Sequence, residues 1–171
     1  VFVCSTGVIG QKLPVEKVLD GVRRIVPELS KDKGTDAAWA IMTTDTVKKE
    51  LAFSLTLGGK EVTLGAIAKG SGMIHPNMAT MLAFYTTDAA VSPALLEKAL
   101  KTVVPGTYNQ MSVDLDTSTN DTLIIMASGL AGNPEIAEEN ADYDAFVAAL
   151  TAIAEHMCAE HAGDGEGATH L

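Results

Sequence analysis

The sequence is poor in cysteine, in positive charge and in long apolar runs. Its two cysteines, Cys4 and Cys158, are too few for a disulfide scaffold and fit a reducing compartment such as the cytoplasm. Twelve basic residues face 22 acidic ones, so the net charge is −10. Because no basic run occurs either, nucleic acid and anionic membrane surfaces are not expected as partners. The apolar runs are far too short to span a bilayer.

The chain also lacks an initiator methionine and a visible signal or transit segment. It starts at Val1 and stops at Leu171, just after the glycine-rich stretch DGEGATHL, so we expect both ends to be cut. The hydrophobic content is 47% and the charged content 20%, both ordinary for a globular protein. A length of 171 residues favours a single domain with a real core.

Hydrophobic periodicity predicts alternating helices and strands, a pattern that is compatible with an α/β fold. Apolar residues recur at helical spacing in residues 14–25, in residues 93–103 behind the capping Ser92, and in residues 146–157. The first of these helices is expected to be scaffold.

Strands are predicted where the period changes. Apolar and polar residues alternate in residues 51–57 and 62–68 around Gly58-Gly59, which indicates a β-hairpin. Residues 80–87 and the apolar run 123–127 are predicted as further strands, the latter buried.

Three smaller features complete the predicted architecture. Residues 1–4 have the apolar pattern of the end of a buried strand. Thr35 or Asp36 can cap a short helix over residues 37–42. The single tryptophan, Trp39, is expected in the core.

The stretch KGSGMIHPNMATMLAFYTTD, residues 69–88, is the one around which we expect the chain to be organised. Its glycines and proline lead to the Ala79–Thr80 bond, and such a loop can hold its last peptide in an unusual geometry. If Thr80 Oγ attacked the Ala79 carbonyl, the resulting ester could be cleaved by water. Thr80 would then carry a free α-amine with a pKa of roughly 8, suited to a general base. Taken alone, however, Thr80 is far better explained as an ordinary β-branched residue at the start of a strand.

Other polar groups are candidates for a site around Thr80. The backbone of STGVIG, residues 5–10, with the Thr6 hydroxyl could form an oxyanion hole, although a plain strand-to-helix turn is the better explanation of this stretch taken alone. Residues 43–46, TTDT, either bond to backbone or line a polar pocket. Lys69 is suited to a carboxylate, and Glu166, between two glycines, could project into a cleft.

The sequence gives no support for a metal site. Residues 109–122 contain several aspartates but lack the central glycine and final glutamate of an EF-hand loop. Their hydroxyls and amides are instead expected to bond to loops around the site. His156, Cys158 and His161 do not gather on one face of a helix, so an amphipathic helix end accounts for them.

Five separated stretches together resemble one family, the glutamate N-acetyltransferases (ornithine acetyltransferases) of arginine biosynthesis. The resemblance covers essentially the whole chain in the family's order, and the Asn-Met-Ala-Thr-Met-Leu motif is very specific. The stretches are STGVIG (5–10), IMTTDT (41–46), AKGSGMIHPNMATMLAF (68–84), DTSTNDT (116–122) and DGEGAT (164–169).

The resemblance implies a self-processing enzyme with an α/β sandwich fold of layered sheets between helices. A precursor would cleave itself at Ala79–Thr80, so residues 1–79 would end the α chain and residues 80–171 would begin the β chain. Two α and two β chains would form a heterotetramer. A full-length member has a further N-terminal segment and a C-terminal domain, so this chain would be its central part, with an incomplete pocket.

The implied reaction is ping-pong transfer of acetyl from N-acetylornithine to glutamate, without a bound cofactor. Thr80 would be the nucleophile, and Thr6 and Gly7 would stabilise the oxyanion. Thr43, Lys69, Thr80 and Glu166 match substrate-binding positions. Acetyl-CoA is an acetyl donor in some members. Two alternatives stay open: a self-processing amidohydrolase or aminopeptidase, and a non-catalytic fragment that is never cleaved.

Overall fold

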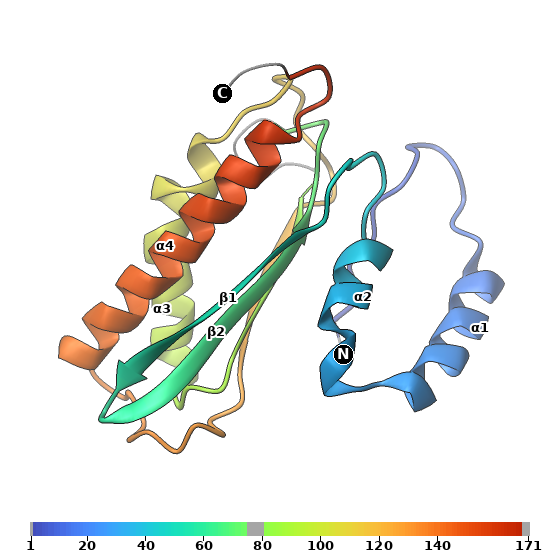
Figure 1. Cartoon of the computed structure of the whole chain (residues 1–171). Coiled ribbons are helices and arrows are strands. Elements are labelled where there is room, and N and C mark those ends of the chain that lie inside the picture. Colours follow the sequence, from blue (N-terminus) through green and yellow to red (C-terminus); the bar gives the residue numbers. More distant parts are fainter. Residues whose placement is uncertain (1, 75–80, 169–171) are drawn as a thin grey trace.

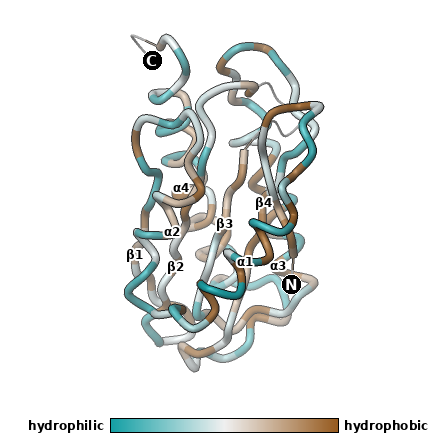
Figure 2. The backbone as a smooth tube through the Cα atoms, turned by 90° about the vertical axis from the view of Figure 1, so that its right-hand side faces the viewer, coloured by the Kyte–Doolittle hydropathy of each residue, from teal (hydrophilic) through white to brown (hydrophobic). Residues whose placement is uncertain are grey.

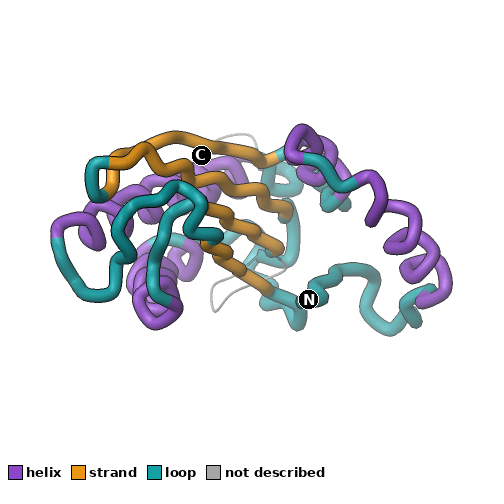
Figure 3. The backbone as a smooth tube through the Cα atoms, turned by 90° about the horizontal axis from the view of Figure 1, so that it is seen from below, coloured by secondary structure: helices purple, strands orange, loops and turns teal. Residues whose placement is uncertain are grey.

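The computed structural model describes residues 2–74 and 81–168 and confirms the predicted α/β class. Its centre is a four-stranded sheet in the order β1-β2-β3-β4. Helices α3 and α4 cover one face of the sheet, and the N-terminal helices lie on the other side (Figures 1 and 3). The core fills the layer between the sheet and α3 and α4.

The predicted β-hairpin is confirmed as β1 (Lys49–Leu57) and β2 (Lys60–Lys69). Its turn uses Gly58 and Gly59 with φ of 54° and 74°, the left-handed backbone that a two-residue hairpin turn needs. The strands pair antiparallel from Lys49 opposite Ala68 to Leu57 opposite Lys60.

The other two strands extend this sheet. β3 (Leu82–Thr87) runs antiparallel to β2, and β4 (Thr122–Ala127) runs parallel to β3. The strand expected at residues 123–127 therefore exists, but it is half-buried, not buried, because it forms an edge of the sheet.

Two of the predicted helices lie as expected. α3 (Pro93–Val103) is capped by the Ser92 side chain, which accepts a hydrogen bond from the Leu95 amide. α4 (Ala141–Gly163) buries the predicted apolar stripe against the sheet. No helix in the described part of the chain is long and apolar enough to cross a membrane.

The N-terminal third departs from the sequence predictions. Helix α1 (Val15–Ile25) forms at the predicted place, but none of its residues is buried and it stands away from the sheet. Apolar and polar residues alternate along it, as Figure 2 shows. Residues 2–4 form no strand and pair with no edge of the sheet, and Phe2 is 84% exposed, so the predicted buried strand end is wrong.

The short helix also differs from its prediction. α2 spans Gly34–Ala40 and has no side-chain cap, since the Thr35 hydroxyl donates to Glu50 and Asp36 pairs with Lys33. Ala38 takes the buried position of this helix. Trp39, the next residue round the helix, therefore points outward and is 54% exposed, so its predicted place in the core is wrong.

Candidate functional site

The described candidate residues come together at one cavity of about 420 Å³. Thr6, Gly7, Thr43, Lys69 and Glu166 all line it, although they come from four separate segments of the chain. Because these five residues line the same cavity, they are better explained as parts of one site than as unrelated structural features.

The predicted cleavage bond, Ala79–Thr80, lies outside the described residues. The start of β3 indicates where the chain continues beyond it. Leu82 pairs with Lys69 across the sheet, so this strand begins beside the lysine that borders the cavity.

Lys69 supplies a buried positive charge at the end of β2. Its side chain is almost fully buried, and its Nζ donates to Thr43 Oγ1 at 3.1 Å. No carboxylate of the described residues lies within ion-pair distance of this ammonium. Burial lowers the pKa of Lys69, and nearby Lys49 lowers it further, while Asp45 acts in the opposite direction. A substrate carboxylate in the cavity would give this ammonium its missing partner.

Glu166 supplies the opposite charge, from the loop after α4. Its amide donates to the Ser71 carbonyl at 2.8 Å, which joins this loop to the segment after β2. Its carboxylate lies against Gly72, where an added Cβ would be 3.0 Å from Oε1. Gly72 therefore gives the carboxylate room that no larger residue would leave.

Hydroxyl groups line the wall between the two charges. Thr44 Oγ1 and Ser71 Oγ share a hydrogen bond of 2.7 Å, and both residues border the cavity. Thr43 and Thr44, from the TTDT stretch, thus lie on the cavity wall, and their role in binding a substrate stays a prediction. Ser71, Gly72 and Met73 were missed, although they lie inside the glycine-rich stretch that contains the predicted nucleophile.

The polar loop after α3 contributes two carboxylates, Asp114 and Asp116, which the sequence analysis considered only as part of a rejected calcium loop. Asp114 accepts hydrogen bonds from the amides of Met73 and Ile74, the latter at 2.9 Å. Burial raises the pKa of Asp114, but the amide hydrogen bonds outweigh it and hold the pKa below its ordinary value. They also support Met73 in a left-handed conformation with φ of 57°.

The same loop contacts the two candidate catalytic segments, as its composition predicts. Asn120 Nδ2 donates to the carbonyl of Ser5, directly before Thr6, at 3.2 Å. Asp121 Oδ1 accepts from the amide of Met81 at 3.1 Å, which ties the loop to the first residue after the undescribed segment. Burial raises the pKa of Asp121.

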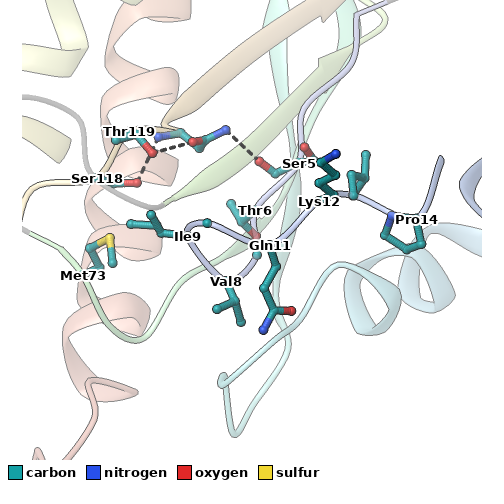
Figure 4. Close-up of a pocket in the computed structure, with 14 residues that line it drawn as sticks. Ser5, Thr6, Val8, Ile9, Gln11, Lys12, Pro14, Met73, Ser118 and Thr119 are labelled. Carbon is teal, nitrogen blue, oxygen red and sulfur yellow. Dashed lines mark hydrogen bonds between the residues drawn. The ribbon is translucent and has the colours of Figure 1, made fainter.

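A second cavity of about 430 Å³ adjoins the first along residues 5–14. Figure 4 shows Ser118 and Thr119 facing the turn that carries Thr6, Val8 and Ile9. Since Thr6 and Gly7 border both cavities, this turn is a partition between them. No cluster of metal-ligating side chains occurs in residues 2–74 and 81–168.

An α/β protein with a cavity bounded by a buried ammonium, a carboxylate and several hydroxyls has the groups to bind a small zwitterionic molecule. Comparison with known proteins narrows this class. The model of the ArgJ family matches residues 1–171, and the chain belongs to this family.

Individual relatives are similar along the whole chain. It is 56% identical over 169 residues, or 99% of the chain, to the arginine biosynthesis bifunctional protein ArgJ of Symbiobacterium thermophilum. It is 54% identical over 171 residues, its full length, to the protein of the same name from Caldanaerobacter subterraneus. The chain spans 42% of the length of each of these curated relatives.

One solved structure is also similar to the chain, the crystal structure of arginine biosynthesis bifunctional protein ArgJ from Bacillus halodurans. It is 44% identical in sequence, and the match covers 50% of this chain and 40% of that one with a TM-score of 0.48.

Proposed function

We propose that the protein of which this chain is a part transfers an acetyl group from N-acetylornithine to glutamate. The observation that carries the proposal is the placement of Lys69 and Glu166 on one cavity with Thr6 and Gly7. A buried ammonium suits an α-carboxylate, and a carboxylate suits the cationic group of ornithine. Family membership and the relatives' names support a place in arginine biosynthesis. A cytoplasmic location is part of the proposal and rests on the low cysteine content alone.

Chain cleavage prepares the nucleophile in this proposal. Thr80 Oγ attacks the Ala79 carbonyl and the peptide nitrogen leaves, which converts the peptide into an ester. Water then hydrolyses the ester, freeing the Ala79 carboxylate and the α-amine of Thr80. Residues 1–79 end one chain and residues 80–171 begin the other, and two of each assemble into a heterotetramer.

Two acyl transfers follow. Thr80 Oγ attacks the acetyl carbonyl of N-acetylornithine while the α-amine of Thr80 takes the hydroxyl proton. Thr6 and the backbone at Gly7 donate to the oxyanion of the tetrahedral intermediate, each donor contributing about 3 kcal/mol in comparable sites. Ornithine leaves with the returned proton, and the amine of glutamate then attacks the acetyl-threonine ester and regenerates Thr80. Acetyl-CoA, where it is used, would supply the acetyl group to Thr80 as a substrate.

Two other functions fit the cavity less well. A hydrolase of the same design would use water in place of glutamate, but Lys69 and Glu166 offer both charges that an amino-acid acceptor needs. A non-catalytic fragment would leave Ala79–Thr80 intact, and Thr80 would then lack its amine. The combination of a charged cavity and the family's cleavage motif favours the transferase.

The decisive experiment measures products from the full-length, matured protein supplied with N-acetylornithine and glutamate. A transferase releases ornithine and N-acetylglutamate in equal amounts, whereas a hydrolase releases ornithine and acetate without glutamate. Release of neither product, or of ornithine and acetate without N-acetylglutamate, would overturn the proposal. A parallel reaction with acetyl-CoA and glutamate tests the second donor, and intact mass tests whether two chains are present.

A further inference from the structure

A charged side chain without any solvent exposure lies behind the cavity wall. Lys49, the first residue of β1, is 0% exposed, and its ammonium lies between two carboxylates. Its Nζ is 2.8 Å from Asp45 Oδ1 and 2.6 Å from Asp164 Oδ2. None of these three residues borders the cavity, so they have no part in the proposed chemistry.

The first carboxylate ties two cavity segments together. Asp45 Oδ1 also accepts the amide of Gly70 at 2.6 Å, directly after Lys69. Its Oδ2 accepts the amide of Thr43 at 3.2 Å. Burial raises the pKa of Asp45, but the bonds from Lys49 and from these amides outweigh it and hold the pKa below its ordinary value.

The second carboxylate ties in the remaining segment. Asp164 lies two residues before Glu166, and its carboxylate accepts both the amide and the hydroxyl of Thr46. Burial raises its pKa, and the bonds from Lys49 and Thr46 reverse the shift. The position of Glu166 is therefore coupled to the TTDT segment and to β1.

Desolvated charges hold such segments to a narrow range of positions. A buried ion pair adds little net stability over an apolar pair of the same volume, but an ion left without its partner costs several kcal/mol. A small displacement of Gly70, Thr43 or Asp164 would unpair a donor or acceptor in this network. The arrangement thus fixes three segments relative to one another more strictly than apolar packing does.

We propose that Lys49, Asp45 and Asp164 are positioning residues that set the relative placement of Lys69 and Glu166. The network would thereby select substrates that carry a carboxylate and a cation at matching separation. This inference rests on the proposed function for its substrate, although the geometry of the network itself does not depend on it.

The test uses the full-length protein with the double substitution Lys49→Met and Asp164→Asn. This variant keeps the formal charge of the three-residue network at −1, because one positive and one negative group are removed together. If the double variant does not fold, the single variant Asp164→Asn replaces it in the same measurements. Tyr85→Phe is the matched control, since it breaks the buried 2.6 Å hydroxyl bond to Tyr108 away from the cavity.

The kinetic readout is the separation of KM from kcat for N-acetylornithine. We expect KM to rise about tenfold in the double variant, with a smaller change in kcat, because the substrate's charged groups meet displaced partners. The control, which lowers stability without reaching the cavity, should leave KM unchanged. A double variant with the KM of wild type, or with only the changes seen in Tyr85→Phe, would overturn the positioning role.

A second readout does not depend on turnover. Trace labelling with acetic anhydride, read by mass spectrometry, compares the reactivity of Lys69 with that of Lys60 at the other end of β2. In the double variant, the ratio of Lys69 acetylation to Lys60 acetylation should change severalfold from its wild-type value. In Tyr85→Phe this ratio should stay unchanged. An unchanged ratio in the double variant refutes the inference. If wild type shows no transfer, the proposed function fails, and labelling still decides the positioning role.

Discussion

The substitution Lys49→Met gives the most demanding test of the buried network. Methionine is close to lysine in length and apolar, so the main change is the loss of the charge that Asp45 and Asp164 share. Both carboxylate oxygens lie within 2.8 Å of the same nitrogen, and the lysine is 0% exposed. Breaking a buried ion pair by removing one partner costs about 3–5 kcal/mol. We therefore expect the free energy of unfolding to fall by about 4 kcal/mol at neutral pH, roughly a thousandfold in the unfolding constant.

The pH dependence has a defined sign. In wild type the pKa values of Asp45 and Asp164 are lowered, so their stabilisation is present above the unfolded value of about 3.9 and is lost as pH falls through the folded values. In the variant the two carboxylates face each other without a cation, so a pKa of the pair is raised and one group takes up a proton. The stability deficit of the variant is thus largest at neutral pH and narrows as pH falls toward about 4.

The assay is urea unfolding followed by circular dichroism at several pH values between about 4 and 7. Lys101→Met is the control, because its ion pair with Glu97 is largely exposed and its loss should change nothing measurable. A deficit below about 1 kcal/mol at neutral pH would contradict the desolvation argument. A deficit that stays constant on acidification would contradict the proposed carboxylate repulsion.

Three further predictions concern the cavity and the full-length protein. Thr80→Ala should give one uncut chain on a denaturing gel and no transferase activity in the product assay. Two pieces from this variant would refute the nucleophile assignment. Thr6→Ala should lower kcat by on the order of a hundredfold with little change in melting temperature, and a normal kcat would reduce its segment to a turn. Gly72→Ala, whose Cβ would be 3.0 Å from the Glu166 carboxylate, should raise KM severalfold without loss of stability. Its control is Gly106→Ala, where no atom lies within 4 Å of the added Cβ, and equal kinetics in both variants would remove the role of Glu166.

The sequence by itself determined the hairpin and the helices α3 and α4, because short stretches of residues specify each of them. The hairpin follows from period-two alternation around two glycines that accept left-handed backbone, and α3 follows from Ser92 and Pro93 at its start. The apolar stripe of α4 predicted its buried face because its members, Phe146, Leu150, Ile153 and Met157, are all buried in the core. Trp39 and residues 2–4 were mispredicted because burial depends on which surface finds a neighbour, and hydrophobicity alone does not supply one.

In the candidate site, too, the sequence predicted individual residues, and the tertiary structure decided how they are arranged. Motifs predicted Thr6, Thr43, Lys69 and Glu166, but only the fold brings them to one cavity. Along the chain, Lys48-Lys49-Glu50 is a short charged run with no sign that its middle member is buried. Its second partner, Asp164, lies 115 residues away, so no local pattern could have paired them. The sequence by itself determined which charges exist, and the tertiary structure decided which of them lose water, because desolvation depends on packing between distant segments.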